Sequence, residues 1–400
     1  MSMIDLEQYQ SEVEREQQAI LRYWMQHTLD ETNDGFIGRI DGADVRHATA
    51  PKGAVLNSRI LWAFSVAYNH TKNAQYLEVA ERAFDYITHH FIDKKYGGVF
   101  WSVDYKGKPL DTKKQVYAIA FAIYGLSEYA LASGSEKAKQ AALELYDCIE
   151  KHSHDNDRGG YIEALTRDWQ DITDLRLSEK DANERKSMNT HLHVLEGYAN
   201  LYRIWPDEVL KKNLVEIIHL FLDHIIDAKS KHLVLFFDDD WQKRSQTISF
   251  GHDIEAAWLV QEAAEQVGDT DLITRVKEVS LQIAGAAANG LDSDGGLWYE
   301  QEEMHLVKEK HWWVQAEAMV GFLNAWQLSQ NPIFLERSFH NWRFVQKYIV
   351  DKENGEWFWG VNAEHAVMQT EDKTGLWKCP YHNVRACLEV AKRLRNLKRE

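Results

Sequence analysis

Five histidines occupy one recurring position in this chain, at the start of a predicted helix. They are His191, His193, His252, His311 and His382. Histidine has the unperturbed side-chain pKa nearest neutrality, so it can accept and return a proton at physiological pH. A single histidine of this kind would most simply be structural. Five at the same phase of a repeat predict a site for acid–base chemistry.

Carboxylates and indoles accompany these histidines. Glu255 follows His252 at i, i+3, so the two share a helix face and the carboxylate could orient the imidazole or bind a substrate hydroxyl. Glu317 belongs to the helix start that also carries Trp313. An indole face suits the C–H face of a sugar ring. We therefore predict that Trp313 and Trp377, which both lie near histidines, contact a sugar, whereas packing explains most other tryptophans.

Metal binding is the main competing use of such a cluster. His191 and His193 would point about 200° apart on a helix, because each residue turns the helix by about 100°. No His-x-x-x-His, Cys-x-x-Cys or Glu-x-x-His pair accompanies the cluster with an evident set of ligands, although metal sites rely on such spacings. Glycine loops that cradle phosphates are lacking as well. We therefore expect neither a metal nor a cofactor.

Two other reactions fit the residue types less well. Glu255 and Glu317 could form the carboxylate pair of a glycoside hydrolase, but a hydrolase needs no histidine pair. Cys379 stands three residues before His382 and could be a nucleophile, yet a small residue beside a helix start is the commoner reason for it. Proton removal next to a carbonyl, by bases that titrate near pH 7, is favoured over acetal cleavage.

A repeat of about 60 to 70 residues places these groups at the same position in each of its units. Each unit begins with a glycine or turn followed by aromatic or aliphatic residues. The six signals start at Gly35, Gly97, Gly159, His232, Gly295 and Gly355. Two helices and a short hairpin fill each unit, and such repeats bury their faces only against their neighbours. Because neither end of the chain resembles a polar capping repeat, we expect the six units to close into a ring.

The predicted fold is therefore all-α, an (α/α)6 barrel that forms one domain over residues 1–400. The starts of its inner helices would lie together at one mouth, with the short hairpins around them. The polar segment 168–185 follows the third turn signal and is unusually long. Long polar connections of this kind are often functional, so we expect it to form a loop over the mouth.

Charge and cysteine content exclude several functions. The net charge of −16 argues against a nucleic-acid partner, because phosphate binding depends on clustered Lys and Arg. The acidic first residues show no secretory signal, and no run of about 18 apolar residues predicts a membrane span. The three cysteines are an odd number at unhelpful spacings, which favours reduced thiols. We expect a cytoplasmic protein with no evident oligomeric partner.

Five segments of the chain carry a family resemblance. They are LNSRILW at 56–62, KSMNTHLH at 186–193, FGHDIEA at 250–256, KHWWVQAEA at 310–318 and WKCPYHN at 377–383. Together they resemble the cellobiose 2-epimerases of the N-acylglucosamine 2-epimerase superfamily, and the resemblance runs along nearly all of the chain. Val314 stands where that family is expected to have a proline. This change could shift the helix start without removing a chemical group.

The resemblance implies reversible inversion at C2 of the reducing-end glucose in a β-1,4-linked disaccharide, which gives the mannose epimer. It implies that His252 and His382 are the acid and base, with no cofactor. The residues implied to bind, polarise or stack on the sugar are Arg59, Tyr117, Asn189, His193, Glu255, Trp313 and Trp377. His193 also counts among the catalytic histidines, and Glu317 is expected to bind substrate.

The residue types agree with this chemistry. A C2 proton becomes acidic once the ring opens to an aldehyde, and inversion needs a base on one face of the enediolate and an acid on the other. Two histidines from different repeats can flank that plane, and Arg59, which is always charged, can stabilise the oxyanion. Cellobiose, mannobiose and lactose all fit, and either histidine could act on either face.

Two alternatives stay open beside the disaccharide epimerase. A monosaccharide epimerase or aldose–ketose isomerase on the same barrel would differ only in where the proton returns and whether a second sugar fits. A non-catalytic protein could instead bind sugar with its tryptophan-rich mouth. Turnover of cellobiose, free mannose or an N-acylglucosamine separates the three.

Overall fold

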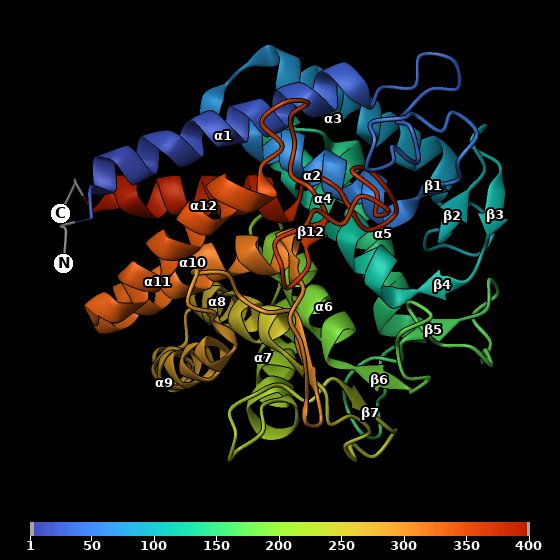
Figure 1. The fold of residues 1–400 in the computed structure, drawn as a ribbon. Coiled ribbons are helices and arrows are strands. Elements are labelled where there is room, and N and C mark those ends of the chain that lie inside the picture. The colour runs from blue at the N-terminus through green and yellow to red at the C-terminus, as the bar shows by residue number, and fades with distance from the viewer. Residues whose placement is uncertain (1–3, 398–400) are drawn as a thin grey trace.

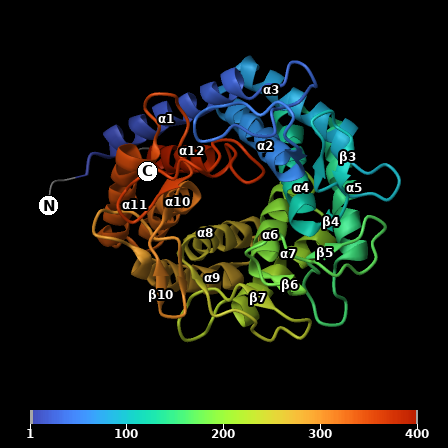
Figure 2. The same cartoon turned by 45° about the vertical axis from the view of Figure 1, so that its right-hand side comes forward.

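Two concentric rings of six α-helices make up the protein between residues 4 and 397, the part that this computed structural model describes (Figure 1). The inner helices are α2 (Ala54–Thr71), α4 (Val116–Ser133), α6 (Met188–Tyr202), α8 (Phe250–Val267), α10 (Trp312–Ser329) and α12 (His382–Asn396). The outer helices are α1 (Leu6–His27), α3 (Ala74–Tyr86), α5 (Glu136–His152), α7 (Glu208–Leu220), α9 (Thr270–Ala287) and α11 (Pro332–Phe344). Figure 2 shows the inner helices around one centre. The predicted (α/α)6 barrel is confirmed.

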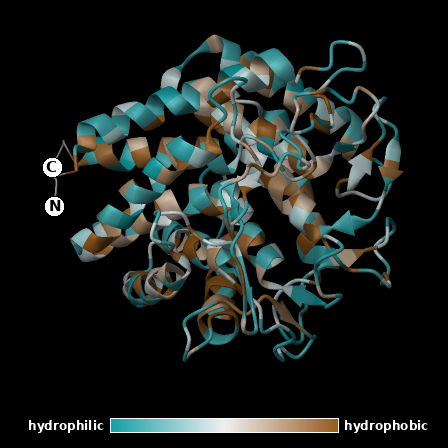
Figure 3. Ribbon diagram, in the orientation of Figure 1, coloured by the Kyte–Doolittle hydropathy of each residue, from teal (hydrophilic) through white to brown (hydrophobic). Residues whose placement is uncertain are grey.

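Burial on all sides distinguishes the inner helices from the outer ones. In α4 every residue from 116 to 129 is buried. Its apolar composition would also suit a membrane span, but packing against α2, α5 and α6 explains it. The outer helix α5 buries Ala138, Ala142 and Leu145 on one stripe, the pattern of a helix with one face in water. Figure 3 shows α1, another outer helix, with a mostly hydrophilic surface toward the viewer.

The ring closes where the last inner helix meets the first. The guanidinium carbon of Arg59 on α2 lies 4.5 Å from the ring centroid of Tyr381, the residue before α12. Trp62 of α2 packs against the same ring at 5.6 Å between centroids. The outer helix α1 lies along α12 (Figure 1). The first helix of the chain therefore completes the last unit of the barrel.

Short antiparallel strands connect the helices at the mouth. They are β1 (Lys52–Gly53), β2 (Ser102–Val103), β3 (Pro109–Asp111), β4 (Lys114–Gln115), β5 (Ala164–Leu165), β6 (Lys186–Ser187), β7 (Phe236–Phe237), β8 (Ile248–Ser249), β9 (Glu300–Glu302), β10 (His305–Val307), β11 (Lys310–His311) and β12 (Gly360–Val361). They pair as β1–β2–β3, β4–β5, β6–β7, β8–β9–β10 and β11–β12. Strands β1, β4, β6, β8 and β11 each lead directly into an inner helix, so the pairings hold five helix starts at the same end.

A buried ion pair recurs in the repeats and fastens the turns to the helix starts. The aspartate stands just after an outer helix, and the lysine lies in the strand before an inner helix. These pairs are Asp30–Lys52, Asp93–Lys114, Asp155–Lys186 and Asp292–Lys310, at 2.8 to 3.0 Å. The lysine of each pair is at most 1% exposed, so its aspartate balances a buried charge and holds the turn in one orientation. Sequence analysis did not identify these pairs, although aspartates recur with the turn signals.

The segment 168–185 contains no helix or strand and is held to the mouth by backbone contacts. Gln115 and Lys113 donate side-chain hydrogen bonds to its main-chain carbonyls at 3.2 and 3.0 Å. Burial raises the pKa of Glu300 on β9 to about 7, and the charges of Lys180 and Asp181 also act on it. The segment therefore reaches from the third repeat to the β9–β10 hairpin of the fifth.

Candidate active site

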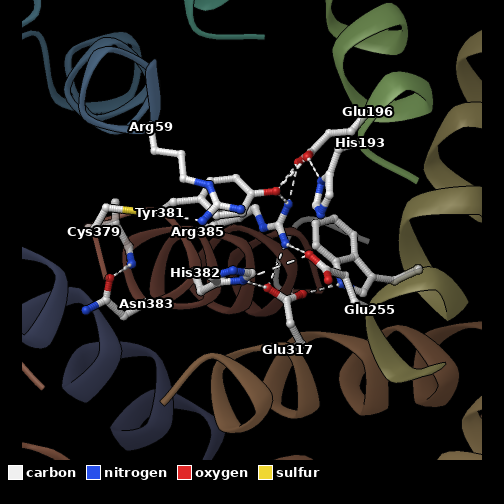
Figure 4. A network of polar contacts seen from close by, with 12 residues as sticks. Arg59, His193, Glu196, Glu255, Glu317, Cys379, Tyr381, His382, Asn383 and Arg385 are labelled. Atoms are coloured by element: carbon white, nitrogen blue, oxygen red, sulfur yellow. Dashed lines mark hydrogen bonds and ion pairs between the residues drawn. The ribbon is translucent and has the colours of Figure 1, made fainter. Parts of the chain in front are cut away.

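The first two turns of the inner helices bring side chains from all six repeats to one central site. Figure 4 shows part of this site, around Arg385. Those that sequence analysis predicted are Arg59, Tyr117, His193, His252, Glu255, Trp313, Glu317 and His382. Because all six inner helices point the same way, their N-termini surround this site. Helix N-termini carry partial positive charge, which favours a negatively charged reaction intermediate.

His382 is oriented by a carboxylate from another repeat. Its Nδ1 lies 2.7 Å from Oε1 of Glu317 on α10. Arg385 donates to the same oxygen at 2.6 Å, and Trp258 donates to Oε2 at 3.0 Å. Since Arg and Trp only donate, Glu317 acts as an acceptor and Nδ1 of His382 carries the proton. The lone pair of Nε2 is then available as a base.

His193 has a carboxylate partner on its own helix. Its Nδ1 lies 2.9 Å from Oε2 of Glu196. The Glu196 carboxylate also accepts hydrogen bonds from the Tyr381 hydroxyl at 2.6 Å and from an N–H of Arg385. Burial by itself would raise the pKa of Glu196, but the Arg385 charge and the His193 hydrogen bond lower it to about 2. The carboxylate is therefore ionised, and it holds the Nδ1 proton of His193.

His252 differs from the expectation that Glu255 would orient it. Its Nδ1 bonds the hydroxyl of Ser249 at 2.8 Å, whereas Glu255 accepts from Arg385 at 2.6 Å. His252 belongs to the first turn of α8, and Ser249 is the residue that precedes this helix. Helical side chains lean toward the N-terminus, which brings the imidazole to Ser249 and away from Glu255.

Arg385 is the centre of the polar network (Figure 4). It is 2% exposed and binds Glu196, Glu255 and Glu317, which come from three other inner helices. Its guanidinium also lies 4.8 Å from the ring of Trp258. One fixed cation thus neutralises part of the charge of three buried carboxylates and holds four inner helices in register.

Burial lowers the pKa values of all three site histidines. The pKa of His252 falls to about 3, through burial first and the charge of His193 second. That of His382 lies well below its usual value because of burial and the positive charge of Arg59. Burial also lowers the pKa of His193, although Glu196 opposes this. The expectation of bases that titrate near pH 7 is therefore wrong, since these imidazoles are neutral there, the form that accepts protons.

Arg59 combines a buried charge with unused donors. It donates to the Tyr117 hydroxyl at 2.7 Å, and its Nε has no protein partner among residues 4–397. These donors suit an oxyanion on a substrate. Its neighbour Cys379 is fully buried, and burial raises the pKa of that thiol. A thiol held in the protonated form argues against a nucleophilic role.

The two tryptophans that were predicted to stack on a sugar lie beside other residues of the site. The ring of Trp313 is 4.8 Å from that of His252 and 5.7 Å from that of His382, between centroids. A Cβ on Gly251 would come within 2.6 Å of the Trp313 ring, so glycine there is what lets the indole approach. Trp377 lies 6.1 Å from the ring of Tyr117. Both indoles are partly exposed.

We expect Trp313→Ala and Trp377→Ala each to weaken productive sugar binding while leaving part of the activity. The loss in kcat/KM should be about 1–3 kcal/mol, because large aromatic side chains often dominate binding. Steady-state kinetics with unfolding curves as a control measure it. Trp326→Phe on the same helix as Trp313 but far from its start provides a matched control. Unchanged kinetics in both alanine variants would make these tryptophans packing residues.

Two other histidines of the same repeat phase have structural roles. His191 is fully buried, and its Nε2 accepts the backbone N–H of Tyr161 at 2.9 Å. His311 bonds Glu309 at 2.8 Å. The i, i+2 spacing explains the difference on α6, because His191 and His193 leave the helix in different directions.

Asn189 lies one helical turn nearer the mouth than His193 on α6. It borders a cavity of about 20 Å³ together with Arg176 and Asp181 of the 168–185 segment. Its Oδ1 atom is buried and has no partner among residues 4–397. A role for Asn189 in sugar binding stays a prediction.

Glu255, Glu317 and His382 come together as metal ligands would, with one donor atom of each within 4.8 Å of the others. Arg385, however, bridges the two carboxylates with hydrogen bonds of 2.6 Å to each. A metal ion would have to displace this permanently charged guanidinium. The side chains favour an ion-pair network at this place.

Sequence analysis missed three residues of the site: Glu196, Ser249 and Arg385. Glu196 follows His193 at the same i, i+3 spacing that drew attention to Glu255, so this signal could have identified it. Ser249 could have been found as a serine at the expected N-cap position of a helix, although its hydroxyl bonds His252 and does not cap the backbone. For Arg385 the sequence offers only its place three residues after His382.

Comparison with known proteins finds relatives along nearly the whole chain. A family model described as N-acylglucosamine 2-epimerase (GlcNAc 2-epimerase) matches residues 35–386. A cellobiose 2-epimerase of Bacteroides fragilis is 50% identical over 373 residues, 93% of this chain and 95% of that protein. The structure of cellobiose 2-epimerase from Bacillus thermoamylovorans has a TM-score of 0.93 and 38% identity, covering 97% of this chain and 100% of the other. A D-mannose isomerase structure, 20% identical, shares the fold with a TM-score of 0.85 and covers 98% of this chain and 100% of its own.

Proposed function

The chain belongs to the N-acylglucosamine 2-epimerase family, and from this we propose that it epimerises cellobiose or a related β-1,4-linked disaccharide at C2 of the reducing-end glucose. One observation carries the mechanism. His252 and His382 come from different helices, both lie close to the indole of Trp313, and each has Nδ1 occupied by a protein partner. Both therefore have Nε2 available for a substrate proton.

The reaction starts from the open-chain aldehyde of the reducing sugar. One histidine removes the C2 proton through Nε2, and the electron pair of the C–H bond moves into the C1 carbonyl to form an enediolate. Arg59 holds the oxyanion with its positive charge and with Nε–H, which has no protein partner among residues 4–397. The helix N-termini favour the same negative charge. The other histidine then delivers a proton to the opposite face of C2.

The partners of Nδ1 support different roles for the two histidines. The Glu317 carboxylate accepts from Nδ1 of His382, which orients the imidazole and favours the imidazolium that forms after proton removal, against the opposing effects of burial and of the Arg59 and Arg385 charges. Ser249 gives His252 a neutral partner, and its depressed pKa makes its protonated form a strong acid. Both arrangements are compatible with transfer in either direction, as a reversible epimerase requires.

The decisive experiment is turnover of cellobiose in D₂O. We expect the glucosyl-mannose product to carry deuterium at C2, because the histidine that delivers the proton exchanges with solvent. Recovered substrate should gain label more slowly. The C2 signal of isolated product in the NMR spectrum, after partial conversion, measures this.

A fully protonated C2 in the product would contradict removal and return of the proton by two histidines. A ketose product would identify aldose–ketose isomerisation instead, because the proton would then return to C1. Faster turnover of free mannose or an N-acylglucosamine than of cellobiose would replace the disaccharide by a monosaccharide. Binding of cellobiose without turnover would leave a sugar-binding protein.

A further inference from the structure

A second cavity lies at the opposite end of the barrel from the site histidines. Its volume is about 440 Å³, within the range of small-molecule sites. Residues near the C-terminal ends of the inner helices line it, including His70 of α2, Leu131 of α4, Gln266 of α8 and Lys392 of α12. We call this cavity the rear chamber.

One layer of side chains separates the rear chamber from the proposed active site. Glu196 and Arg385 line the chamber. Glu196 also bonds His193 at 2.9 Å, and Arg385 also bonds Glu255 at 2.6 Å. Trp258 lines it as well. A ligand in the chamber would therefore lie beneath the network that holds the histidines and would not touch the sugar.

Among the charged side chains that line the chamber, one carboxylate has no ion-pair partner within residues 4–397. Three cations there are each paired with a lining carboxylate: Arg203 with Glu128 at 2.8 Å, Lys392 with Glu389 at 3.0 Å, and Arg385 with Glu196. Glu262 is the exception, because within residues 4–397 it has neither a hydrogen bond nor an ion pair. Burial raises its pKa and the charge of Glu389 raises it further, although the charges of Lys392, Arg393 and Arg385 oppose this shift. A positive ligand would supply the missing partner.

The helix directions add to this negative potential. The same alignment that points N-termini at the histidines points the C-termini of α2, α4, α6, α8 and α12 toward the chamber. Unpaired carbonyls give helix C-termini partial negative charge, which favours cations within the last turn. The barrel thus offers positive helix ends to the active site and negative helix ends to the rear chamber.

Two polar groups without partners in the chamber suit a ligand that also carries hydroxyls. The side-chain amide of Gln266, one turn after Glu262 on α8, has no protein partner in the described chain. The buried Nε of Arg385 is likewise without a partner there. The amide can donate or accept, and Nε–H needs an acceptor. An alkyl chain alone would satisfy none of these groups.

We propose that the rear chamber is a second ligand site, separate from the sugar site, that binds a small hydroxylated primary ammonium compound with its ammonium group on Glu262. The ammonium would donate to the Glu262 carboxylate as a charge-assisted hydrogen bond. Hydroxyl groups of the ligand would bond Gln266 and Arg385. The site takes its selectivity for positive charge from the unpaired carboxylate and the helix ends together.

Two isosteric probes test this proposal on the intact protein. Tris(hydroxymethyl)aminomethane at pH 7 is a hydroxylated primary ammonium ion, and pentaerythritol has the same shape with a neutral hydroxymethyl group in place of the ammonium. In sodium phosphate buffer, we expect the first to raise the melting temperature in a saturable manner and the second to have no such effect. Potassium chloride at matched ionic strength provides the salt control. Equal stabilisation by pentaerythritol or by potassium chloride would overturn the proposal.

Variants locate the bound cation. We expect Glu262→Gln to weaken binding of the ammonium probe by at least about tenfold, because the charge-assisted bond is lost, while Glu265→Gln, an exposed position on the same helix, leaves it unchanged. Ala199→Phe, which places a ring in the chamber, should also abolish binding with Glu262 intact, so the proposal does not depend on one variant folding. Unchanged binding in either chamber variant, or loss of binding when cellobiose saturates the enzyme, would contradict it.

Discussion

Replacing His252 or His382 with asparagine should lower the epimerisation rate by about 10²–10⁴-fold, the usual contribution of a general acid or base. Inversion needs proton transfer on both faces of C2, so loss of either imidazole stops the reaction in both directions. Asparagine can keep a hydrogen bond to Ser249 or Glu317 but cannot exchange a proton near neutral pH. Initial rates with cellobiose, measured from each epimer, test this result.

An exposed histidine serves as the control for this pair. His219→Asn, on the outer helix α7, should change neither the rate nor the melting temperature. His252→Asn should unfold much like the wild type, because its only polar side-chain partner in the described structure is a serine hydroxyl. If either active-site variant kept more than about a tenth of the wild-type rate with an unchanged melting transition, that histidine would be neither the acid nor the base.

Replacing Arg385 with methionine should destabilise the protein by about 3–5 kcal/mol, the usual cost of removing one partner from a buried ion pair. The change leaves the carboxylates of Glu196, Glu255 and Glu317 together without their shared cation. Urea unfolding at pH 7 measures the difference in the free energy of unfolding. Arg385→Lys keeps the charge but cannot bridge several carboxylates. Its free energy of unfolding should therefore lie between those of the wild type and of Arg385→Met.

The pH dependence distinguishes lost charge from lost packing at Arg385. Without the guanidinium, Glu255 and Glu317 would have folded-state pKa values further above their unfolded values. A raised pKa destabilises the folded state as pH rises through the unfolded value and costs nothing below it. The deficit of Arg385→Met should therefore shrink as the pH falls, and Glu255→Gln added to it should restore part of the stability. A deficit under about 1 kcal/mol, or one independent of pH, would contradict the network.

Local periodicity was sufficient to predict the barrel. Turn signals spaced by about 60 to 70 residues, each followed by a polar stretch and an apolar helix, marked six units, and the structure has an inner helix in each of them. Among the strands of residues 4–397, only β2–β3 and β9–β10 form hairpins, and the other pairs join neighbouring repeats. The residues of the inner helix starts could be predicted for the same reason, because equal phase in a closed repeat means one common place in space. The buried Asp–Lys pairs escaped notice because each joins residues that only the folded turn brings together.

Two identical spacings show that the sequence alone does not predict which side chains bond. His193–Glu196 and His252–Glu255 are both i, i+3 pairs on inner helices, yet only the first pair bonds. His252 lies within reach of the residue that begins its helix, and Arg385, far along the chain, takes Glu255. His382 in turn bonds a carboxylate of another repeat.

The sequence by itself determined which residue types meet at the mouth, because hydrophobic period and turn spacing act over a few residues and set the helices and their phase. Only the tertiary structure decided which acid holds which base and what their pKa values are. Those properties depend on desolvation and on charges contributed by helices distant in sequence, and both exist only once the ring has closed.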